Sequence, residues 1–79
     1  MATLRLFASI REAAGTGTEE IDAPTVGAVI DAASERYGPG FTALLGTCRI
    51  WLNGEPADRS DIVGVGDEVA VLPPVSGGA

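Results

Sequence analysis

One stretch with helical periodicity, set between segments that alternate like strands, constrains the fold of this chain more than any other feature. Thr25 is a favourable helix N-cap, and apolar residues follow it at intervals of three and four positions. These apolar residues are Val26, Val29, Ile30, Ala33 and Tyr37. Pro24 precedes the stretch, and Gly38 with Pro39 ends it. The sequence therefore predicts one main helix that can cover one face of a sheet.

The segments before this helix alternate between apolar and polar residues. Residues 3–8 are the first predicted strand. Residues 18–23 are a second, more polar strand, which closes a hairpin across a turn marked by Gly15 and Gly17. After the helix, residues 41–45 are expected to be a short helical or irregular connector.

The segments after the helix alternate in the same way. Residues 48–53 and 67–72 are predicted strands, and Asn53-Gly54 is a strong turn signal that leads into a short stretch at residues 55–57. We expect the first and last strands to be parallel neighbours at the centre of a mixed sheet. The predicted fold class is α+β, with one main helix on one face of that sheet.

Length and composition indicate a single small domain with a real core. The chain has 79 residues, of which 46% are hydrophobic. Its single cysteine cannot form an internal disulfide, and no apolar run approaches the roughly 20 residues of a membrane span. The first residues lack the pattern of a secretory signal. We expect a cytoplasmic protein that does not bind membranes.

The charged residues exclude several classes of function. Eleven acids and five arginines give a net charge of −6, which argues against nucleic acid or anionic lipid and suits a partner with a basic surface. Histidine and lysine are both absent, so the usual general base, metal ligand and Schiff-base amine are missing. We expect no metal site and no self-sufficient enzyme. No side-chain amine is present to accept an isopeptide bond from another copy of the chain.

The C-terminal segment is a poor end for a folded domain. Pro73 and Pro74 stop the last strand, and Gly77 with Gly78 leaves the backbone bare enough to enter a narrow channel. A frayed terminus is the alternative interpretation. We expect a domain at residues 1–73 and a flexible diglycine tail at residues 74–79.

Two motifs carry a resemblance to a known family. Residues 7–15 read FASIREAAG, and residues 66–78 read GDEVAVLPPVSGG. Together they resemble the small subunit of molybdopterin synthase, which is in the sulfur-carrier branch of the ubiquitin-like β-grasp proteins, and the similarity spans the whole chain. The resemblance implies a β-grasp fold. It also implies a non-catalytic sulfur carrier that acts in molybdenum cofactor biosynthesis and holds no bound cofactor.

The resemblance assigns a role to each residue of the tail. Gly78 matches the glycine that a ubiquitin-activating-like adenylating enzyme converts with ATP into an acyl-adenylate, and that a sulfur donor system then converts into a thiocarboxylate. The large synthase subunit receives the tail. The residues that would thread its channel are Gly77, Ser76, Val75 and Pro74.

Ala79 departs from the family pattern, which ends at the second glycine. One extra residue moves the terminal carboxyl group by roughly 3.5 Å. We expect a peptidase to remove Ala79 before Gly78 is activated; the alternative is that the chain serves another purpose.

A cluster of outward-facing apolar residues is the candidate docking surface. By alternation, Phe7, Trp51 and Leu72 lie on the outward side of neighbouring strands, and with Pro56 they form an apolar patch beside the tail. Phe7 and Leu72 match partner-contact positions of the family, and Arg11 matches a polar contact at the rim. Isolated exposed apolar residues are common, so the patch could also be ordinary surface.

Other motifs favour structural roles. Cys48 lies on the inward side of a predicted strand with no histidine or lysine to activate it, so we expect an inert core residue. Gly64 and Gly66 lack the third glycine of a nucleotide-binding loop and indicate a turn. Two alternatives to the molybdopterin synthase subunit stay open: a sulfur carrier for thiazole or cysteine synthesis, and a ubiquitin-like binding module without sulfur transfer.

Overall fold

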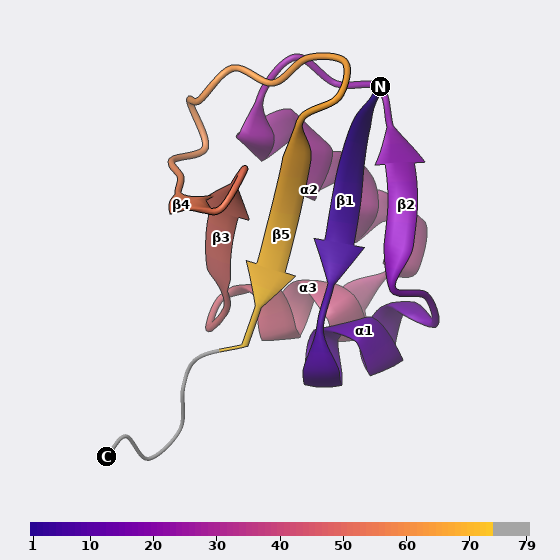
Figure 1. Ribbon diagram of the computed structural model, residues 1–79. Helices are drawn as coiled ribbons and strands as arrows, with labels where there is room; N and C mark the ends of the chain where they lie inside the picture. Colours follow the sequence, from indigo (N-terminus) through magenta and orange to yellow (C-terminus); the bar gives the residue numbers. More distant parts are fainter. Residues whose placement is uncertain (74–79) are drawn as a thin grey trace, which may run out of the picture.

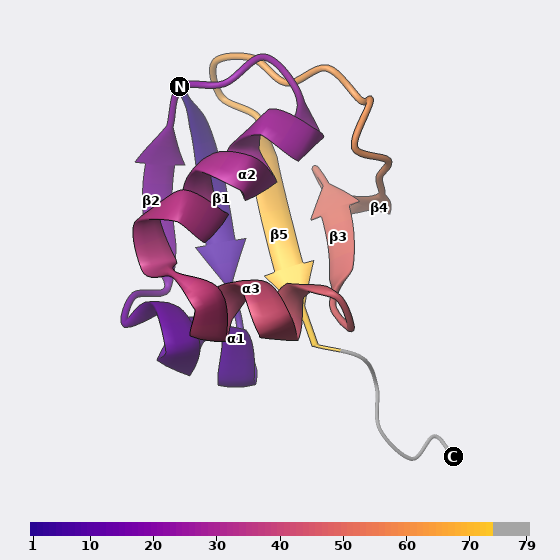
Figure 2. The same cartoon turned by 180° about the vertical axis from the view of Figure 1, so that it is seen from behind.

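A five-stranded sheet with helices on one side makes up the part of the chain that the computed structural model describes, residues 1–73 (Figures 1 and 2). The strands are β1 (Ala2–Leu6), β2 (Thr18–Ile21), β3 (Arg49–Leu52), β4 (Glu55–Pro56) and β5 (Glu68–Leu72). The helices are α1 (Ala8–Ala14), α2 (Val26–Tyr37) and α3 (Pro39–Leu45). The predicted α+β class is confirmed.

The strand order is β2-β1-β5-β3-β4. β1 and β5 are parallel, with Leu4 opposite Val69 and Leu6 opposite Val71, whereas β1 with β2, β3 with β4 and β3 with β5 are antiparallel. The predicted parallel pair at the centre of a mixed sheet is confirmed. Because β1 and β5 run in the same direction, the ends of both strands meet at the same end of the molecule, where the tail begins (Figure 1).

The core lies between the sheet and α2. Leu4, Val69 and Val71 are fully buried on the sheet side. α2 contributes Val26 and Val29, also fully buried, on the face that the helical pattern predicts. Burying a side chain of this size stabilises a fold by about 1.5 to 3 kcal/mol. Among residues 1–73, no polar or charged residue is buried, so this core depends on packing alone.

Helix α2 begins and ends as the sequence predicts. The Thr25 hydroxyl accepts a hydrogen bond from the backbone N–H of Ala28 at 3.1 Å, which is the geometry of a helix N-cap. Gly38 follows the helix with φ of 89°, a value that favours glycine over any residue with a Cβ. At this end the Tyr37 hydroxyl donates to Glu19 of β2 at 2.9 Å, and Arg36 forms an ion pair with the same carboxylate. These contacts attach the end of α2 to the outer strand of the sheet.

Helix α1 was not predicted, and the prediction of a plain hairpin between the first two strands was wrong. β1 ends at Leu6, and the chain turns at Ala8, where φ is 52°, into the helix. Ile10 is fully buried, and this burial holds α1 under the end of the sheet. Gly15 caps the helix with φ of 81° and donates its N–H to the carbonyl oxygen of Arg11. β1 and β2 still pair as predicted, with a helical turn between them.

Helix α3 confirms the helical form of the connector predicted at residues 41–45, but it begins earlier, at Pro39. Pro39, which was expected only to end α2, occupies the first turn of α3, where its missing N–H costs nothing. Phe41 is fully buried, and its ring centroid lies 5.1 Å from that of Tyr37. α2 is thus the main helix, and two shorter helices close the end of the core from which the tail leaves (Figure 2). In the part of the chain described here, no helix has the length and apolar character needed to cross a membrane.

Candidate docking face and tail root

The helices pack against one face of the sheet and leave the other face uncovered (Figures 1 and 2). Alternation along the strands decides which side chains lie on the uncovered face. On β1, Leu4 and Leu6 are buried toward the helices, so Arg5 lies on the uncovered side. On β5, Val69 and Val71 are buried, so Ala70 and Leu72 lie on the uncovered side. This face is the candidate functional site because Leu72 directly precedes the start of the tail.

The register brings the predicted interface residues into cross-strand rows. Trp51 of β3 lies opposite both Ala70 of β5 and Pro56 of β4, and Ala70 lies opposite Arg5 of β1. Side chains that face each other in this way have Cβ atoms about 4.5 to 5.5 Å apart. Apolar groups thus meet across three adjacent strands, β5, β3 and β4.

A second row lies closer to the tail. Leu72 is opposite Arg49 of β3, and Phe7 follows Leu6, which is opposite Val71. Phe7 and Leu72 are thus the residues that directly follow the last pair of β1 with β5. We name the set of Phe7, Trp51, Pro56 and Leu72 the tail-side patch.

The exposure of the tail-side patch suits a surface that contacts another protein. Phe7 is 38% exposed and Pro56 is also exposed, whereas Trp51 and Leu72 are half-buried. The guanidinium carbon of Arg5 lies 6.0 Å from the centroid of the Phe7 ring, at the outer limit of a cation–π contact. Arg11, on α1, lines a surface hollow together with Arg5 and Phe7. The structure therefore places Arg11 at the rim of the patch, and the interface role of all five predicted residues stays a prediction.

The predicted sulfur-carrying residue and tail lie outside the described residues. These are Pro74, Val75, Ser76, Gly77 and Gly78, together with Ala79. What the structure fixes is the root of this segment, since β5 ends at Leu72 and Pro73 follows it. The root is held in the middle of the sheet, between β1 and β3.

Cys48, the single thiol of the chain, lies near this root on the opposite face of the sheet. It precedes Arg49, the cross-strand neighbour of Leu72, and it packs against the core. Its Sγ donates to the carbonyl oxygen of Leu44 at 3.3 Å, and burial raises the pKa of the thiol. A raised pKa lowers the thiolate fraction, and the thiolate is the reactive form. The predicted inward placement is confirmed.

Sequence reasoning missed two residues of this face, Arg5 and Arg49. The sequence does predict that both side chains face outward, because each arginine alternates along its strand with residues that were assigned to the core. The sequence does not assign a role to either arginine, because a charged residue on an outward position is usually ordinary surface. The register shows that Arg49 lies opposite Leu72, and the contact between their side chains shows that Arg5 lies next to Phe7.

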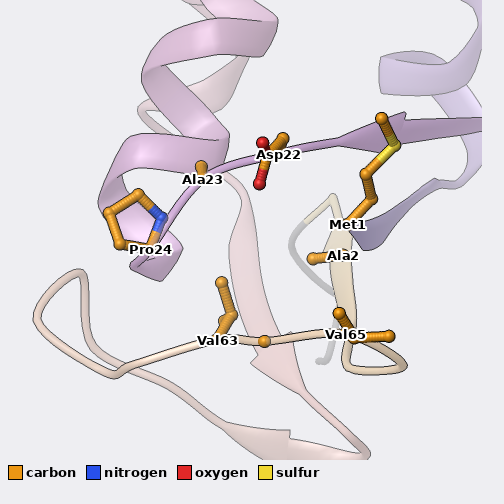
Figure 3. Close-up of a pocket in the computed structure, with 8 residues that line it drawn as sticks. Met1, Ala2, Asp22, Ala23, Pro24, Val63 and Val65 are labelled. Atoms are coloured by element: carbon orange, nitrogen blue, oxygen red, sulfur yellow. The ribbon is translucent and has the colours of Figure 1, made fainter.

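A second hollow lies at the other end of the molecule, where β5 begins. Figure 3 shows its lining, which is mostly apolar and offers Asp22 as its one ionisable side chain. The labelled residues are Met1, Ala2, Asp22, Ala23, Pro24, Val63 and Val65. This hollow has no set of groups that could perform acid–base or nucleophilic chemistry. Within residues 1–73 no three side chains of the metal-binding types come together.

The topology defines the class of protein. A mixed sheet with a parallel central pair, crossed on one face by a main helix, is the ubiquitin-like β-grasp, and solved structures of that fold match this chain. A family model described as the ThiS family matches residues 4–78. The chain therefore belongs to this family of small, ubiquitin-like sulfur carriers.

Individual relatives lie in more than one branch of the family. Small archaeal modifier protein 1 of Haloferax volcanii is 33% identical over 94% of this chain and 97% of its own length. A putative molybdopterin converting factor subunit 1 from Pyrococcus furiosus is 27% identical with a TM-score of 0.83, covering 94% of this chain and 97% of that one. Subunit 1 of the molybdopterin-converting factor of Helicobacter pylori, solved in complex with subunit 2, is 28% identical with a TM-score of 0.76, covering 98% and 97%.

Proposed function

We propose that this protein is the small subunit of molybdopterin synthase and carries sulfur as a thiocarboxylate on Gly78. The observation that carries the proposal is the extent of the family match, which continues through residue 78 and so includes both glycines of the tail. The likeness to the molybdopterin-converting factor subunits of Pyrococcus furiosus and Helicobacter pylori supports this branch of the family.

The chemistry needs a peptidase that removes Ala79, an adenylating enzyme with ATP, a sulfur donor and the large synthase subunit. A peptidase first hydrolyses the amide bond between Gly78 and Ala79. An adenylating enzyme then joins the freed Gly78 carboxylate to the α-phosphate of ATP and releases pyrophosphate, which makes the carbonyl carbon electrophilic. A sulfur donor then adds sulfur at this carbon and AMP leaves, so the product is a thiocarboxylate. The large synthase subunit passes that sulfur to a cyclic pyranopterin monophosphate, and water restores the carboxylate.

The described residues contribute docking and reach. The tail-side patch would hold the domain against the partner while the tail enters its active site. A fully extended chain from Pro74 to Gly78 spans about 17 Å, so the reacting carbon can lie deep in a pocket while the sheet stays outside. The Gly78 carboxylate is the nucleophile that attacks ATP, and no side chain of the chain needs to act as an acid, a base or a nucleophile.

A second candidate is supported by the 33% identical relative, whose name describes a modifier protein. A modifier would transfer its activated tail to an amine on another protein instead of passing sulfur on. Because this chain has no lysine, no side chain of one copy could receive the tail of the next. Sulfur delivery for thiazole or cysteine synthesis is a third candidate, and it shares every step except the acceptor.

The test separates these candidates by their products. A chain that ends at Gly78 is incubated with its adenylating enzyme, ATP and a sulfur donor, and intact-mass spectrometry detects the replacement of one oxygen by sulfur. The loaded chain is then offered to the large synthase subunit with the pyranopterin and, in parallel, to thiazole-forming and cysteine-forming acceptors. We expect sulfur transfer only in the first mixture. Transfer only to another acceptor, or amide-linked conjugates without sulfur uptake, would replace the proposal with the corresponding alternative.

A further inference from the structure

The charges of this protein are distributed unevenly between its two ends. Acidic side chains gather at the end where β5 begins, among them Asp67 and Glu68 at the start of that strand and Asp22 after β2. Arg11 and Arg49 lie at the end where the tail begins, with Glu12 beside Arg11 on the same helix, whereas Arg59 lies in the loop between β4 and β5. Arg11 is on α1, and Arg49 is the first residue of β3, opposite Leu72. The net charge of −6 therefore does not describe the surface around the tail root.

Ion pairing leaves two of these arginines available. Among residues 1–73, the ion pairs are Arg5 with Glu68 at 3.3 Å, Arg59 with Asp31 at 2.8 Å, and Arg36 with Glu19. Arg11 and Arg49 form no ion pair with a described residue. Exposed arginines often lack a partner, so the argument rests on their positions. Arg49 flanks Leu72 on one side of the patch, and Arg11 flanks Phe7 on the other.

This arrangement indicates what the opposing surface carries. We propose that the tail-side patch docks on an apolar partner surface whose edge presents carboxylates to Arg11 and Arg49. A planar guanidinium pairs with a carboxylate through two parallel hydrogen bonds, whereas a basic partner edge would face it with like charge. The proposal rests on the proposed function only in requiring that a protein docks at the tail root. It reverses the expectation of a basic partner that the total charge suggested.

The separation of charge also orients the encounter. An acidic partner surface repels the end of the domain that carries Asp22, Asp67 and Glu68, and attracts the end that carries Arg11 and Arg49. The domain then approaches with its tail first. Rim charges act mainly on the association rate and on its dependence on salt, so these are the quantities to measure.

The first experiment compares two double variants of equal charge. Arg11→Gln with Arg49→Gln removes two positive charges at the rim of the patch. Ile62→Glu with Val65→Glu adds two negative charges at the other end, so both double variants have the same net charge. Ile62 and Val65 are 80% and 90% exposed, so these substitutions bury no charge. Association with the protein's own adenylating enzyme is followed by stopped-flow fluorescence across a range of salt concentrations, after thermal unfolding confirms that each variant folds.

The expected result is a slower association for the rim variant alone. At low salt it should associate roughly tenfold more slowly than the unaltered chain, and the difference should shrink as salt is added. The control variant should stay within about twofold of the unaltered chain. Equal slowing of both variants would mean that only net charge matters. A rim variant that associates as fast as the unaltered chain, or faster, would mean that the partner edge is not acidic.

A second experiment needs no natural partner and so remains decisive if the chain carries no sulfur. Two synthetic peptides, each with two tryptophans among four glutamates or four lysines, are titrated into isotope-labelled protein. We expect the glutamate peptide to shift the amide resonances of Phe7, Arg49 and Leu72, and the lysine peptide to shift those around Asp22 and Asp67. Stronger shifts at the patch with the lysine peptide would overturn the proposal. Failure of sulfur loading by a chain that ends at Gly78 would instead count against the proposed function.

Discussion

The two ends of this domain expose apolar side chains in different ways. At the end where β5 begins, Ile62 and Val65 are 80% and 90% exposed, yet both lie in the loop between β4 and β5. At the tail end, Phe7 is 38% exposed, and Trp51 and Leu72 are only half-buried. We expect the less exposed residues to be the better interface, because neighbouring strands fix Trp51 and Leu72 in rows and a partner need not order them first. Position in a rigid framework therefore says more about docking than exposed fraction does.

The largest expected effect concerns the last residue of the 79-residue chain. Adenylation needs a free carboxylate on Gly78, and in this chain the Gly78 carbonyl is in an amide bond with Ala79. A chain that ends at Gly78 should gain sulfur from its adenylating enzyme, ATP and a donor, and the 79-residue chain should gain none. Intact-mass spectrometry reports both outcomes. If the 79-residue chain gains sulfur equally fast with Ala79 still attached, no trimming is needed.

The next largest effect is expected on the free energy of unfolding, and it tests whether the tail end depends on α1 for its stability. Ile10 is fully buried and anchors this helix under the sheet. Ile10→Ala should lower the free energy of unfolding by about 2 to 5 kcal/mol, the usual cost of removing a large buried aliphatic side chain. Val65→Ala, at the exposed end, should change it by no more than about 0.5 kcal/mol. Chemical denaturation measures both; an equally small change for Ile10→Ala would show that α1 is not held by its buried residue.

The third effect compares docking at the two ends. Phe7→Ala or Leu72→Ala removes a side chain whose burial is worth about 1.5 to 3 kcal/mol, so binding to the large subunit or the adenylating enzyme should weaken tenfold or more. Ile62→Ala removes a more exposed side chain of similar size and should leave both affinities unchanged. Calorimetric titration against each partner is the measurement. An intact thermal transition with unaltered affinity for both patch variants would remove the patch from the docking surface.

The sequence predicted the sheet better than the tail end because only the sheet and its main helix have long periodic patterns of apolar residues. Alternation over residues 67–72 and the stripe after Thr25 each span a whole element, so one face could be separated from the other. Helix α1 has only one fully buried residue, Ile10, and its seven residues are too short to display a stripe. The extended pattern of β1 was therefore continued past its true end, to Ala8.

Prediction of the candidate site from the sequence is limited in a similar way, because the site depends on contacts between segments that are distant in the sequence. Phe7, Trp51 and Leu72 were assigned to one face by parity alone, and the register confirms that placement for Trp51 and Leu72. Phe7 lies beyond the last paired residue of β1. Within residues 1–73 neither Arg11 nor Arg49 forms an ion pair, and this depends on which carboxylates lie near them in space. The sequence contains every charge but not these distances, so it predicted a basic partner from the total charge.

A smaller effect is expected from the contact between α2 and β2 at the tail end. Burial, followed by the hydrogen bond to Glu19, raises the pKa of Tyr37 to about 12 from an ordinary value of 10.0. The folded state therefore favours the neutral phenol, and its contribution to stability is complete below pH 10 and is lost as the pH rises toward 12. Tyr37→Phe should cost about 1 kcal/mol near neutral pH. It should also flatten the fall in stability across that alkaline window, as thermal unfolding at stepped pH would reveal; an unchanged slope would assign the fall to other groups.

The smallest effect is expected at Cys48, and it tests whether the thiol nearest the tail root takes part in sulfur transfer. Its Sγ donates to the Leu44 carbonyl oxygen, and burial keeps it in the protonated, unreactive form. Cys48→Ala should cost a modest amount of stability, because the side chain is only partly buried, and should leave sulfur loading of a chain that ends at Gly78 unchanged. The measurement is the rate of mass gain under the adenylating enzyme, with Cys48→Ser as the matched variant that keeps a hydrogen-bond donor. If both folded variants lose thiocarboxylate formation, sulfur passes through this thiol before it reaches the tail, and the docking face alone does not account for the function of the tail end.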